Sequence, residues 1–288
     1  MKLLRGQNMM DDVKIFDIQR ASFVDGPGIR TTIFFKGCNL KCKWCHNPES
    51  QSPEFEMMFY KDKCIHCGKC TQICTHKRCI LCRKCTEICP TGARKICGES
   101  MTCEKVLKEI LKDKDYYISS GGGVTFSGGE CMLQINSLEQ ILKYCNKYGI
   151  NTAVDTAGCV SWEYFEKIIP YTNIFLYDIK CISSKLHKLG CGISNKIILE
   201  NLQKLSDAKN TNIIIRIPVV GGFNDDFEEM KKIADFLSNV KHKCVELLPY
   251  HSMGEHKYLS LGRTVEKFYT PSDTNMQLFK ELFKANVI

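Results

Sequence analysis

The placement of its cysteines constrains the fold of this chain more than any other feature. Eleven of the 19 cysteines in the 288-residue sequence lie between positions 38 and 89, and most are followed by the next after two to four residues. Such spacing favours metal ligation over a disulfide framework, because thiols this close along the chain can surround one metal centre. We therefore expect this part of the chain to fold around metal centres.

The first group of cysteines is one ligand short of a closed site. Cys38, Cys42 and Cys45 form a C-x3-C-x2-C motif directly after the apolar run Ile33–Phe35. A 4Fe-4S cluster ordinarily takes four cysteines, so three of them leave one iron open to a ligand from outside the protein. An open metal position is typical of a catalytic centre. A zinc knuckle, or three unrelated thiols, is the alternative that spacing alone leaves open.

Eight further cysteines form two successive C-x2-C-x2-C-x3-C runs, the second followed by Pro90. This is the signature of bacterial ferredoxins with two 4Fe-4S clusters, in which the fourth cysteine of each run ligates the other cluster. The expected ligand sets are Cys64, Cys67, Cys70 and Cys89 for one cluster and Cys79, Cys82, Cys85 and Cys74 for the other. Zinc is the alternative metal. Because only Thr75–Arg78 separates the runs, Cys97 and Cys103 are alternative ligands.

Charge and hydropathy restrict the partners and the compartment. Residues 53–97 carry nine Lys and Arg against four Asp and Glu, a local charge of +5. This excess could neutralise two anionic clusters, and what remains exposed would attract an acidic electron carrier. The overall charge of +8 is not arranged as a basic stripe with interleaved aromatics, so we expect no nucleic-acid ligand. Without an 18-residue apolar segment or a signal peptide, we expect no membrane association and a reducing, oxygen-poor cytoplasm.

Outside this segment, short apolar runs alternate with amphipathic helical patterns. After a first strand at 13–18, the expected strands are 31–35, 123–126, 152–155, 174–179, 212–217 and 244–248. The expected helices are 102–112, 137–147, 162–169, 195–207, 227–239 and one after Met276. Strands that are apolar throughout and separated by helices indicate a parallel sheet covered by helices. Six such units predict an α/β fold, a partial (β/α)6 barrel.

Each of the six expected units ends its strand in polar or ligand residues. They are Cys38, Ser127–Glu130, Asp155, Asp178 with Lys180, Arg216, and His251. Parallel barrels carry their chemistry at the carboxyl ends of the strands. Six ends out of six therefore favour one shared site.

Together these motifs resemble those of the radical S-adenosylmethionine (SAM) enzymes and, among them, the glycyl radical enzyme activating enzymes. The resemblance rests on the cysteine loop, with Trp44 before its third cysteine, on the turn Asp25-Gly26-Pro27-Gly28, and on Gly128-Gly129-Glu130. The paired cysteine runs resemble the subgroup that carries a ferredoxin domain. The resemblance implies a discontinuous radical SAM barrel of residues 1–52 and 98–288, with a two-cluster ferredoxin-like insert at 53–97.

The resemblance also implies roles for single residues. In this family the methionine amino and carboxylate groups of SAM chelate the open iron, and the Gly-Gly-Glu motif binds the amino group. The residues implied to lie around SAM are Trp44, Gly128, Gly129, Glu130, Asp155, Asp178, Lys180, Arg216 and His251. Cys131 stands where the family usually has proline, which leaves the rigidity of that loop open. The Asp25–Gly28 turn would contact the glycine-bearing loop of a partner enzyme.

The implied activity is reductive cleavage of SAM to a 5′-deoxyadenosyl radical, which removes a Cα hydrogen from a glycine of a glycyl radical enzyme. Three 4Fe-4S clusters are implied, with flavodoxin or ferredoxin as electron donor. Alternatives are a radical SAM enzyme that acts on a small molecule, a ferredoxin-like electron carrier and a zinc-dependent nucleic-acid binder. Nothing in the sequence chooses among formate-lyases, diol and hydroxyproline dehydratases, choline lyase and arylacetate decarboxylases as the partner.

Overall fold

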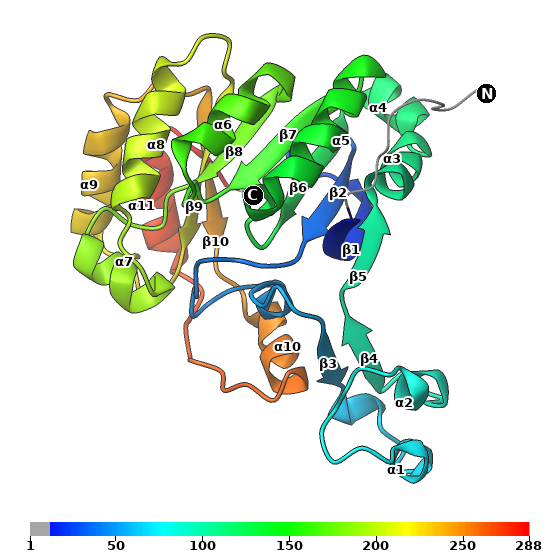
Figure 1. The fold of residues 1–288 in the computed structure, drawn as a ribbon. Coiled ribbons are helices and arrows are strands. Elements are labelled where there is room, and N and C mark those ends of the chain that lie inside the picture. Colours follow the sequence, from blue (N-terminus) through cyan, green and yellow to red (C-terminus); the bar gives the residue numbers. More distant parts are fainter. Residues whose placement is uncertain (1–11, 288) are drawn as a thin grey trace.

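The apolar runs predicted as strands form one continuous sheet in the computed structural model, which describes residues 12–287 (Figure 1). Its nine strands have the order β11-β10-β9-β8-β7-β6-β2-β1-β5. They are β1 (Asp12–Ser22), β2 (Arg30–Phe35), β5 (Glu99–Thr102), β6 (Gly123–Gly128), β7 (Asn151–Thr156), β8 (Ile174–Asp178), β9 (Ile213–Val219), β10 (Cys244–Pro249) and β11 (Asn286–Val287). β2 and β6 to β10 are parallel neighbours in chain order. The six predicted parallel strands are therefore confirmed.

The sheet differs from the prediction at its edges. β1 extends four residues beyond the predicted strand and pairs antiparallel with both β2 and β5. Its continuation to Ser22 brings the following turn back over the start of β2. The turn then contacts β6 and β9, where Thr125 Oγ1 and Arg216 Nη2 donate hydrogen bonds to the carbonyls of Asp25 and Val24.

Helices follow the parallel strands and cover the sheet (Figure 1). They are α3 (Cys103–Leu111), α4 (Lys114–Ser120), α5 (Ile135–Lys147), α6 (Trp162–Ile168), α7 (Ser184–Cys191), α8 (Lys196–Asp207), α9 (Phe227–Leu237), α10 (Glu255–Ser260) and α11 (Asp273–Phe283). The apolar face of each amphipathic pattern packs against the sheet. On α5, for example, Leu138, Ile141 and Leu142 are fully buried. Burying each such side chain stabilises the fold by about 1.5–3 kcal/mol. Short helices α4, α7 and α10 were not predicted.

Residues 53–97 form a separate two-stranded sheet with cysteine-bearing loops (Figure 1). β3 (Glu56–Phe59) and β4 (Arg94–Cys97) pair antiparallel, and the short helices α1 (Lys69–Ile73) and α2 (Lys84–Glu87) lie between them in sequence. The five 3₁₀ turns of the described chain are η1 (Pro48–Ser50), η2 (Lys61–Lys63), η3 (Cys131–Gln134), η4 (Ile169–Tyr171) and η5 (Ser252–Gly254). All eight cysteines of the two predicted runs lie between β3 and β4.

The stem of this segment is held to the sheet by a buried lysine. Lys36, directly after β2, has a fully buried side chain whose Nζ donates hydrogen bonds to the carbonyls of Glu49 (2.7 Å) and Ser52 (3.0 Å). The same ammonium lies 3.6 Å from the carboxylate of Glu56 on β3. A buried charge needs such partners, because burial without them is costly. Lys36 therefore joins the cysteine loop of the sheet to the stem of segment 53–97.

Candidate functional site

The loop that carries Cys38, Cys42 and Cys45 is clamped at its centre by α7. Lys41 N donates to Cys191 O (2.8 Å), and Lys43 N donates to Gly190 O (3.0 Å). The last carbonyls of a helix have no partner within the helix, and here the loop supplies their donors on both sides of Cys42. The three half-buried cysteines are thus presented by a loop with fixed backbone.

The environment of the three thiols differs from one to the next. Burial raises the pKa of Cys38 and raises the pKa of Cys45 to about 12. A hydrogen bond from the Cys191 thiol lowers the pKa of Cys42. Cys191 itself is fully buried. Cys191 lies outside the three cysteine groups of the sequence, and only the fold brings it to the cysteine loop.

Trp44 packs the cysteine loop against two aromatic side chains. Its ring lies 4.1 Å from that of Phe223 and 5.7 Å from that of Phe268, measured between centroids. The side chain is 9% exposed, so packing occupies most of its surface. The observed contacts of Trp44 therefore hold the cysteine loop against the core.

The Gly-Gly-Glu segment runs beside the same loop. Gly129 N donates to Phe35 O and Glu130 N donates to Gly37 O, both at 2.8 Å. A side chain at Gly129 would place its Cβ 2.1 Å from Gly37 O, so only glycine permits this approach. The end of β6 is thereby fixed next to the end of β2.

The buried Glu130 joins β6 to β7. Its carboxylate accepts hydrogen bonds from Thr156 Oγ1 (2.8 and 2.9 Å) and Ala157 N (3.2 Å). Burial raises the pKa of Glu130 to about 7. The thiol of Cys131, which is also fully buried, donates to Phe126 O (3.5 Å) and Asp155 O (3.7 Å). Cys131 thus links the two strand ends where a proline was expected.

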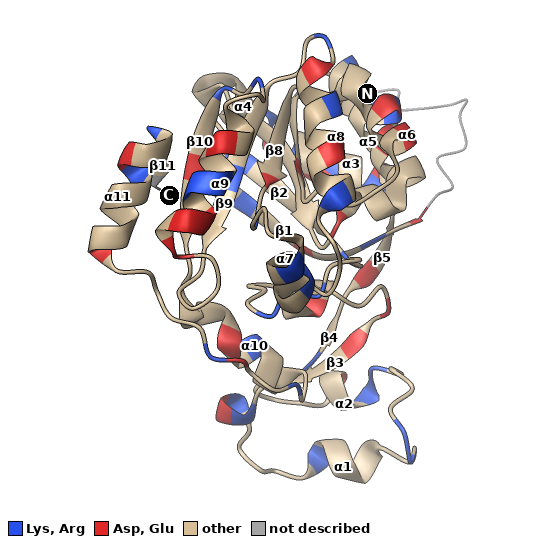
Figure 2. Ribbon diagram, turned by 90° about the vertical axis from the view of Figure 1, so that its left-hand side faces the viewer, with Lys and Arg blue, Asp and Glu red and all other residues tan. Residues whose placement is uncertain are grey.

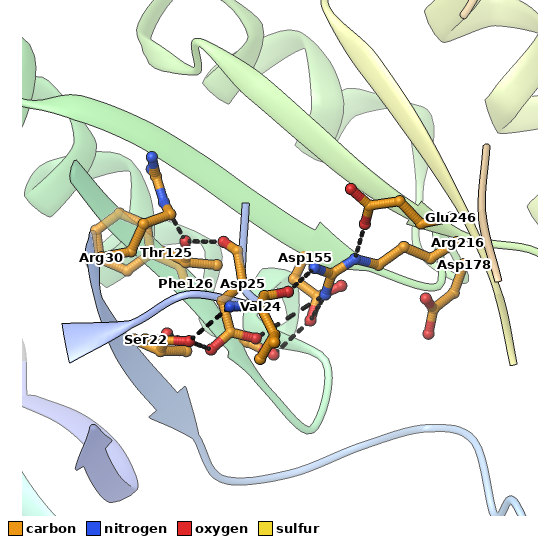
Figure 3. Close-up of polar contacts among 12 residues, drawn as sticks. Ser22, Val24, Asp25, Arg30, Thr125, Phe126, Asp155, Asp178, Arg216 and Glu246 are labelled. Carbon is orange, nitrogen blue, oxygen red and sulfur yellow. Dashed lines mark hydrogen bonds and ion pairs between the residues drawn. The ribbon is translucent and has the colours of Figure 1, made fainter. Parts of the chain in front are cut away.

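Arg216 lies among carboxylates from two strands and from the turn after β1 (Figure 3). Its Nε donates to Glu246 Oε2 on β10 (3.1 Å), and its Nη1 lies 3.8 Å from Asp155 Oδ2 on β7 and 3.9 Å from Asp25 Oδ1. Its Nη2 donates to Val24 O. With a side chain only 6% exposed, this one cation balances three carboxylates. Burial raises the pKa of Asp155 to about 6, against the opposing effect of Arg216.

A second cation, Lys180, lies beside the cysteine loop. Its Nζ is 2.9 Å from Asp178 Oδ2, and its side chain is 9% exposed. Burial lowers the pKa of Lys180, but the charges of Asp178 and Cys42 outweigh burial and raise it. A permanent positive charge therefore faces the thiol of Cys42.

The Asp25–Gly28 turn points its aspartate inward, while its Pro27 is exposed. Asp25 Oδ2 accepts hydrogen bonds from Ser22 Oγ (2.6 Å) and Thr32 Oγ1 (2.7 Å), and the side chain is 15% exposed. Phe23 and Val24 are instead 73% and 53% exposed. Gly28 has a φ of +72° and its Cβ would lie 2.4 Å from Gly122 N, so packing alone explains this glycine.

A cavity of about 490 Å³ extends from this turn to the stem of segment 53–97. Its lining includes Asp17 and Phe34 on the sheet, Val24 and Asp25 on the turn, His46 and His251 by the cysteine loop, and Tyr60, Lys95 and Cys97 on the stem. The rings of His46 and His251 lie 4.7 Å apart, edge to face. Burial and the nearby Lys257 lower the pKa of His46 to about 4. The cavity volume of about 490 Å³ falls in the range of ligand pockets.

In segment 53–97, four cysteines surround a small cavity of about 30 Å³. They are Cys64, Cys67, Cys70 and Cys89, the set expected from cross-ligation. Burial raises the pKa of Cys85 of the second set, and Cys79 and Cys74 raise it further. The alternative ligands are elsewhere, since Cys97 lines the larger cavity and the thiol of Cys103 donates to Ser137 O at 3.8 Å. Among residues 12–287, no three His, Cys, Asp or Glu side chains converge tightly enough to hold a single metal ion.

Within the part of the chain that the structure describes, no helix is long and apolar enough to cross a membrane.

The chain is similar to known proteins over nearly its whole length. Residues 32–237 match the family model of the radical SAM superfamily. The chain is 39% identical to the trans-4-hydroxy-L-proline dehydratase activating enzyme of Clostridioides difficile, over 94% of this chain and 96% of that protein. It is 39% identical to the choline trimethylamine-lyase activating enzyme of Oleidesulfovibrio alaskensis, over 86% of both chains. It is 40% identical to the (2S)-3-sulfopropanediol dehydratase activating enzyme of Klebsiella oxytoca, over 86% of this chain and 85% of that one.

Solved structures agree at the level of the fold. A radical SAM methyltransferase from Sphaerobacter thermophilus superposes with a TM-score of 0.57 at 12% identity, covering 99% of this chain and 74% of the other. TYW1 with a lysine-pyruvate adduct superposes with a TM-score of 0.52 at 16% identity, covering 89% and 74%.

Proposed function

The chain belongs to the radical SAM superfamily and, within it, to the glycyl radical enzyme activating enzymes, and on this premise we propose how its residues divide the reaction. Enzymes of this class cleave SAM reductively and remove a Cα hydrogen from a glycine of a partner enzyme. In our proposal residues 1–52 and 98–288 form the partial (β/α)6 barrel that carries out this chemistry. Residues 53–97 are an inserted electron-transfer domain.

One observation carries the assignment of the catalytic centre. The loop of Cys38, Cys42 and Cys45 is hydrogen-bonded on one side to α7 and on the other to the Gly-Gly-Glu segment at the end of β6. The pKa values of Cys38 and Cys45 are raised, so a negatively charged thiolate without a nearby positive charge is unfavourable in this pocket. A cationic metal group takes thiolates as ligands and removes that cost. These three residues therefore fit a 4Fe-4S cluster with one open iron, which would supply the electron that breaks the sulfur–carbon bond of SAM.

The protein itself binds and orients SAM. In our proposal the backbone of Gly128 and Gly129 binds the amino group, with Glu130 behind it, while Asp155, Asp178, Lys180, Arg216 and His251 surround the remainder. The carboxylates around Arg216 outnumber its single charge, which suits a ligand that is itself cationic. Trp44 contributes by holding the loop in place. Such positioning is the main task left to the protein, because a reactive group held in one geometry reacts far faster.

We further propose that the insert holds two 4Fe-4S clusters, on Cys64, Cys67, Cys70 and Cys89 and on Cys74, Cys79, Cys82 and Cys85. The cavity shared by the first four supports this division. Basic residues are exposed on the same segment, which Figure 2 shows around α1 and α2. They are Lys61, Lys63, Lys69, Lys77, Arg78, Arg83 and Lys84. An acidic carrier such as flavodoxin or ferredoxin would dock there.

The partner's glycine-bearing loop is proposed to enter the cavity between the turn and the insert stem. The cavity reaches both Asp25 and His251, and so borders the proposed SAM site. Exposed Phe23 and Val24 offer apolar contacts at its entrance. The backbone that faces the partner is that of the turn formed by Asp25, Gly26, Pro27 and Gly28.

We place the enzyme in a reducing cytoplasm, where thiol ligands persist.

The test is formation of a glycyl radical. Anaerobically reconstituted protein, SAM and a chemical reductant would be mixed separately with hydroxyproline dehydratase, choline lyase, sulfopropanediol dehydratase and an arylacetate decarboxylase. Electron paramagnetic resonance should detect a glycyl radical with at least one of them, at a yield that depends on SAM. Cleavage of SAM with no radical on any member of this panel, together with turnover of a small molecule, would contradict the proposal.

A further inference from the structure

Arg94 occupies a distinctive position at the base of the insert. It stands on β4 opposite Phe59 of β3, and its guanidinium carbon lies 5.0 Å from the Phe59 ring centroid. From there it lines the same small cavity as Cys64, Cys67 and Cys70. The base of the hairpin therefore delivers a cation directly to the cysteine-lined cavity.

Arg94 interacts electrostatically with both cysteine sets. Its side chain donates a hydrogen bond to Cys70 of the first set, and the charges of Cys74 and Cys85 of the second set act on it as well. Its Nε is buried and has no acceptor among the described protein atoms. A buried donor without an acceptor costs free energy, so this N–H is suited to an acceptor held inside the cavity. A guanidinium has five donors in a fixed fork and stays charged at all accessible pH values.

We propose that Arg94 is a positioning residue shared by the two iron–sulfur sites of the insert, where it donates to their sulfur ligands and stabilises their reduced states. The proposal rests on the proposed function, since it requires clusters on the two cysteine sets. A cluster gains one negative charge when it is reduced, and hydrogen bonds to its sulfurs and nearby charge set its potential. Removal of the cation should therefore make reduction of both clusters harder.

Arg94 differs in this respect from the other basic residues of the segment. The seven exposed Lys and Arg around α1 and α2 face solvent, where water and salt screen their charge. Lys95, the next residue on β4, is exposed and lines the larger cavity instead. Alternation along the strand puts neighbouring side chains on opposite faces. Lys95 is therefore the matched control: a similar charge, one residue away, on the other face.

The experiment compares Arg94→Gln, Arg94→Lys and Lys95→Gln with the parent. The anaerobically reconstituted full-length proteins would be analysed for iron and sulfide, and cluster potentials would be measured by redox titration followed by electron paramagnetic resonance. At the parent's insert-cluster midpoint, Arg94→Gln should lower the ratio of reduced to oxidised cluster about tenfold, a shift of about 59 mV for one electron. Arg94→Lys should recover part of this shift, and Lys95→Gln should change the ratio by less than about twofold.

The outcomes separate this inference from the function it rests on. Loss of insert iron in Arg94→Gln but not in Arg94→Lys would also support it, because the cation would then be needed to hold two anionic clusters side by side. Full iron content with parental potentials in Arg94→Gln would overturn it, as would an equal shift in Lys95→Gln. If the parent holds only the cluster of the cysteine loop after reconstitution, the proposed insert clusters fail, and this inference fails with them.

Discussion

The Asp25 carboxylate lies 3.9 Å from Nη1 of Arg216, which joins the turn after β1 to the middle of β9. The same nitrogen is 3.8 Å from Asp155. Arg216 therefore lies between Asp25 and Asp155, the carboxylate that we propose faces SAM. In this arrangement the segment that meets the partner and the pocket that holds SAM share one buried cation.

Asp25→Asn should uncouple the two halves of the reaction. Loss of the charge removes the attraction to Arg216 and weakens the hold of Ser22 and Thr32 on the turn, so the partner's glycine is displaced. A displacement of about 1 Å can cost on the order of a hundredfold in rate. We expect the ratio of glycyl radical formed to SAM cleaved to fall by about that factor, measured by paramagnetic resonance and chromatography. Glu163→Gln, which changes an exposed carboxylate on α6 outside the lining of this cavity, should leave the ratio nearly unchanged.

The fold was predictable from the sequence where burial dictates residue type. Strands buried on both faces must be apolar throughout, and that pattern located β2 and β6 to β10 to within a few residues. Polar residues at the ends of β7 and β8, Asp155 and Asp178, were predictable for the same reason, since such a residue interrupts an apolar run. Arg216, which was also expected at a strand end, lies instead in the middle of β9. Cysteine spacing likewise grouped Cys64, Cys67, Cys70 and Cys89, which line one cavity.

Contacts between distant segments were not predictable. The link from Asp25 to Arg216 depends on how far β1 continues and on where the turn then lies. The approach of Cys191 to Cys42 depends on α7, which is only eight residues long. The sequence nevertheless contains the residues that start and end α7. Ser183 caps its start by accepting a hydrogen bond from Leu186 N, and Gly192 ends it with a φ of +87°. A capping serine followed nine residues later by glycine is a helix signature that periodicity alone overlooks.

Arg216→Gln should destabilise the protein strongly. Loss of this cation leaves the buried carboxylates of Asp155 and Glu246 unpaired, and breaking a buried ion pair from one side typically costs about 3–5 kcal/mol. Anaerobic urea unfolding at pH 8, followed by circular dichroism, would measure the loss. Arg263→Gln breaks a more exposed pair with Glu56 and should cost no more than about 1 kcal/mol. Equal losses in the two variants would show that Arg216 does not balance the carboxylates as described.

SAM affinity should fall as the pH is lowered through the range 7 to 6. Burial raises the pKa of Glu130 to about 7 and that of Asp155 to about 6, so each carboxylate is negative above its pKa and neutral below it. A cationic ligand binds better to the charged forms. Anaerobic titration calorimetry between pH 5.5 and 8 should show both steps, with Asp155→Asn removing the lower one and Glu130→Gln the upper one. A flat profile in the parent would refute their role in binding SAM.

Replacement of Cys191 should alter the cluster proposed at Cys42 without removing any ligand. The Cys191 thiol donates to Cys42, and hydrogen bonds to ligating sulfurs raise the potential of an iron–sulfur cluster. Cys191→Ala should therefore shift the midpoint of this cluster to more negative potential, while Cys191→Ser, which keeps a donor, should shift it less. Cys145→Ala removes an equally buried thiol from α5 and should have no effect. Identical potentials in all three variants would show that Cys191 only fills space.

The most direct test of the whole account is to replace Cys38, Cys42 and Cys45 together with alanine and measure iron content and 5′-deoxyadenosine formation on the same anaerobic sample. With three clusters the parent holds about 12 irons per chain, and the variant should keep about eight of them. We predict that the variant forms no 5′-deoxyadenosine from SAM and reductant, while the insert clusters remain visible by paramagnetic resonance. Formation of 5′-deoxyadenosine at the parental rate would contradict the assignment of the catalytic centre to this loop.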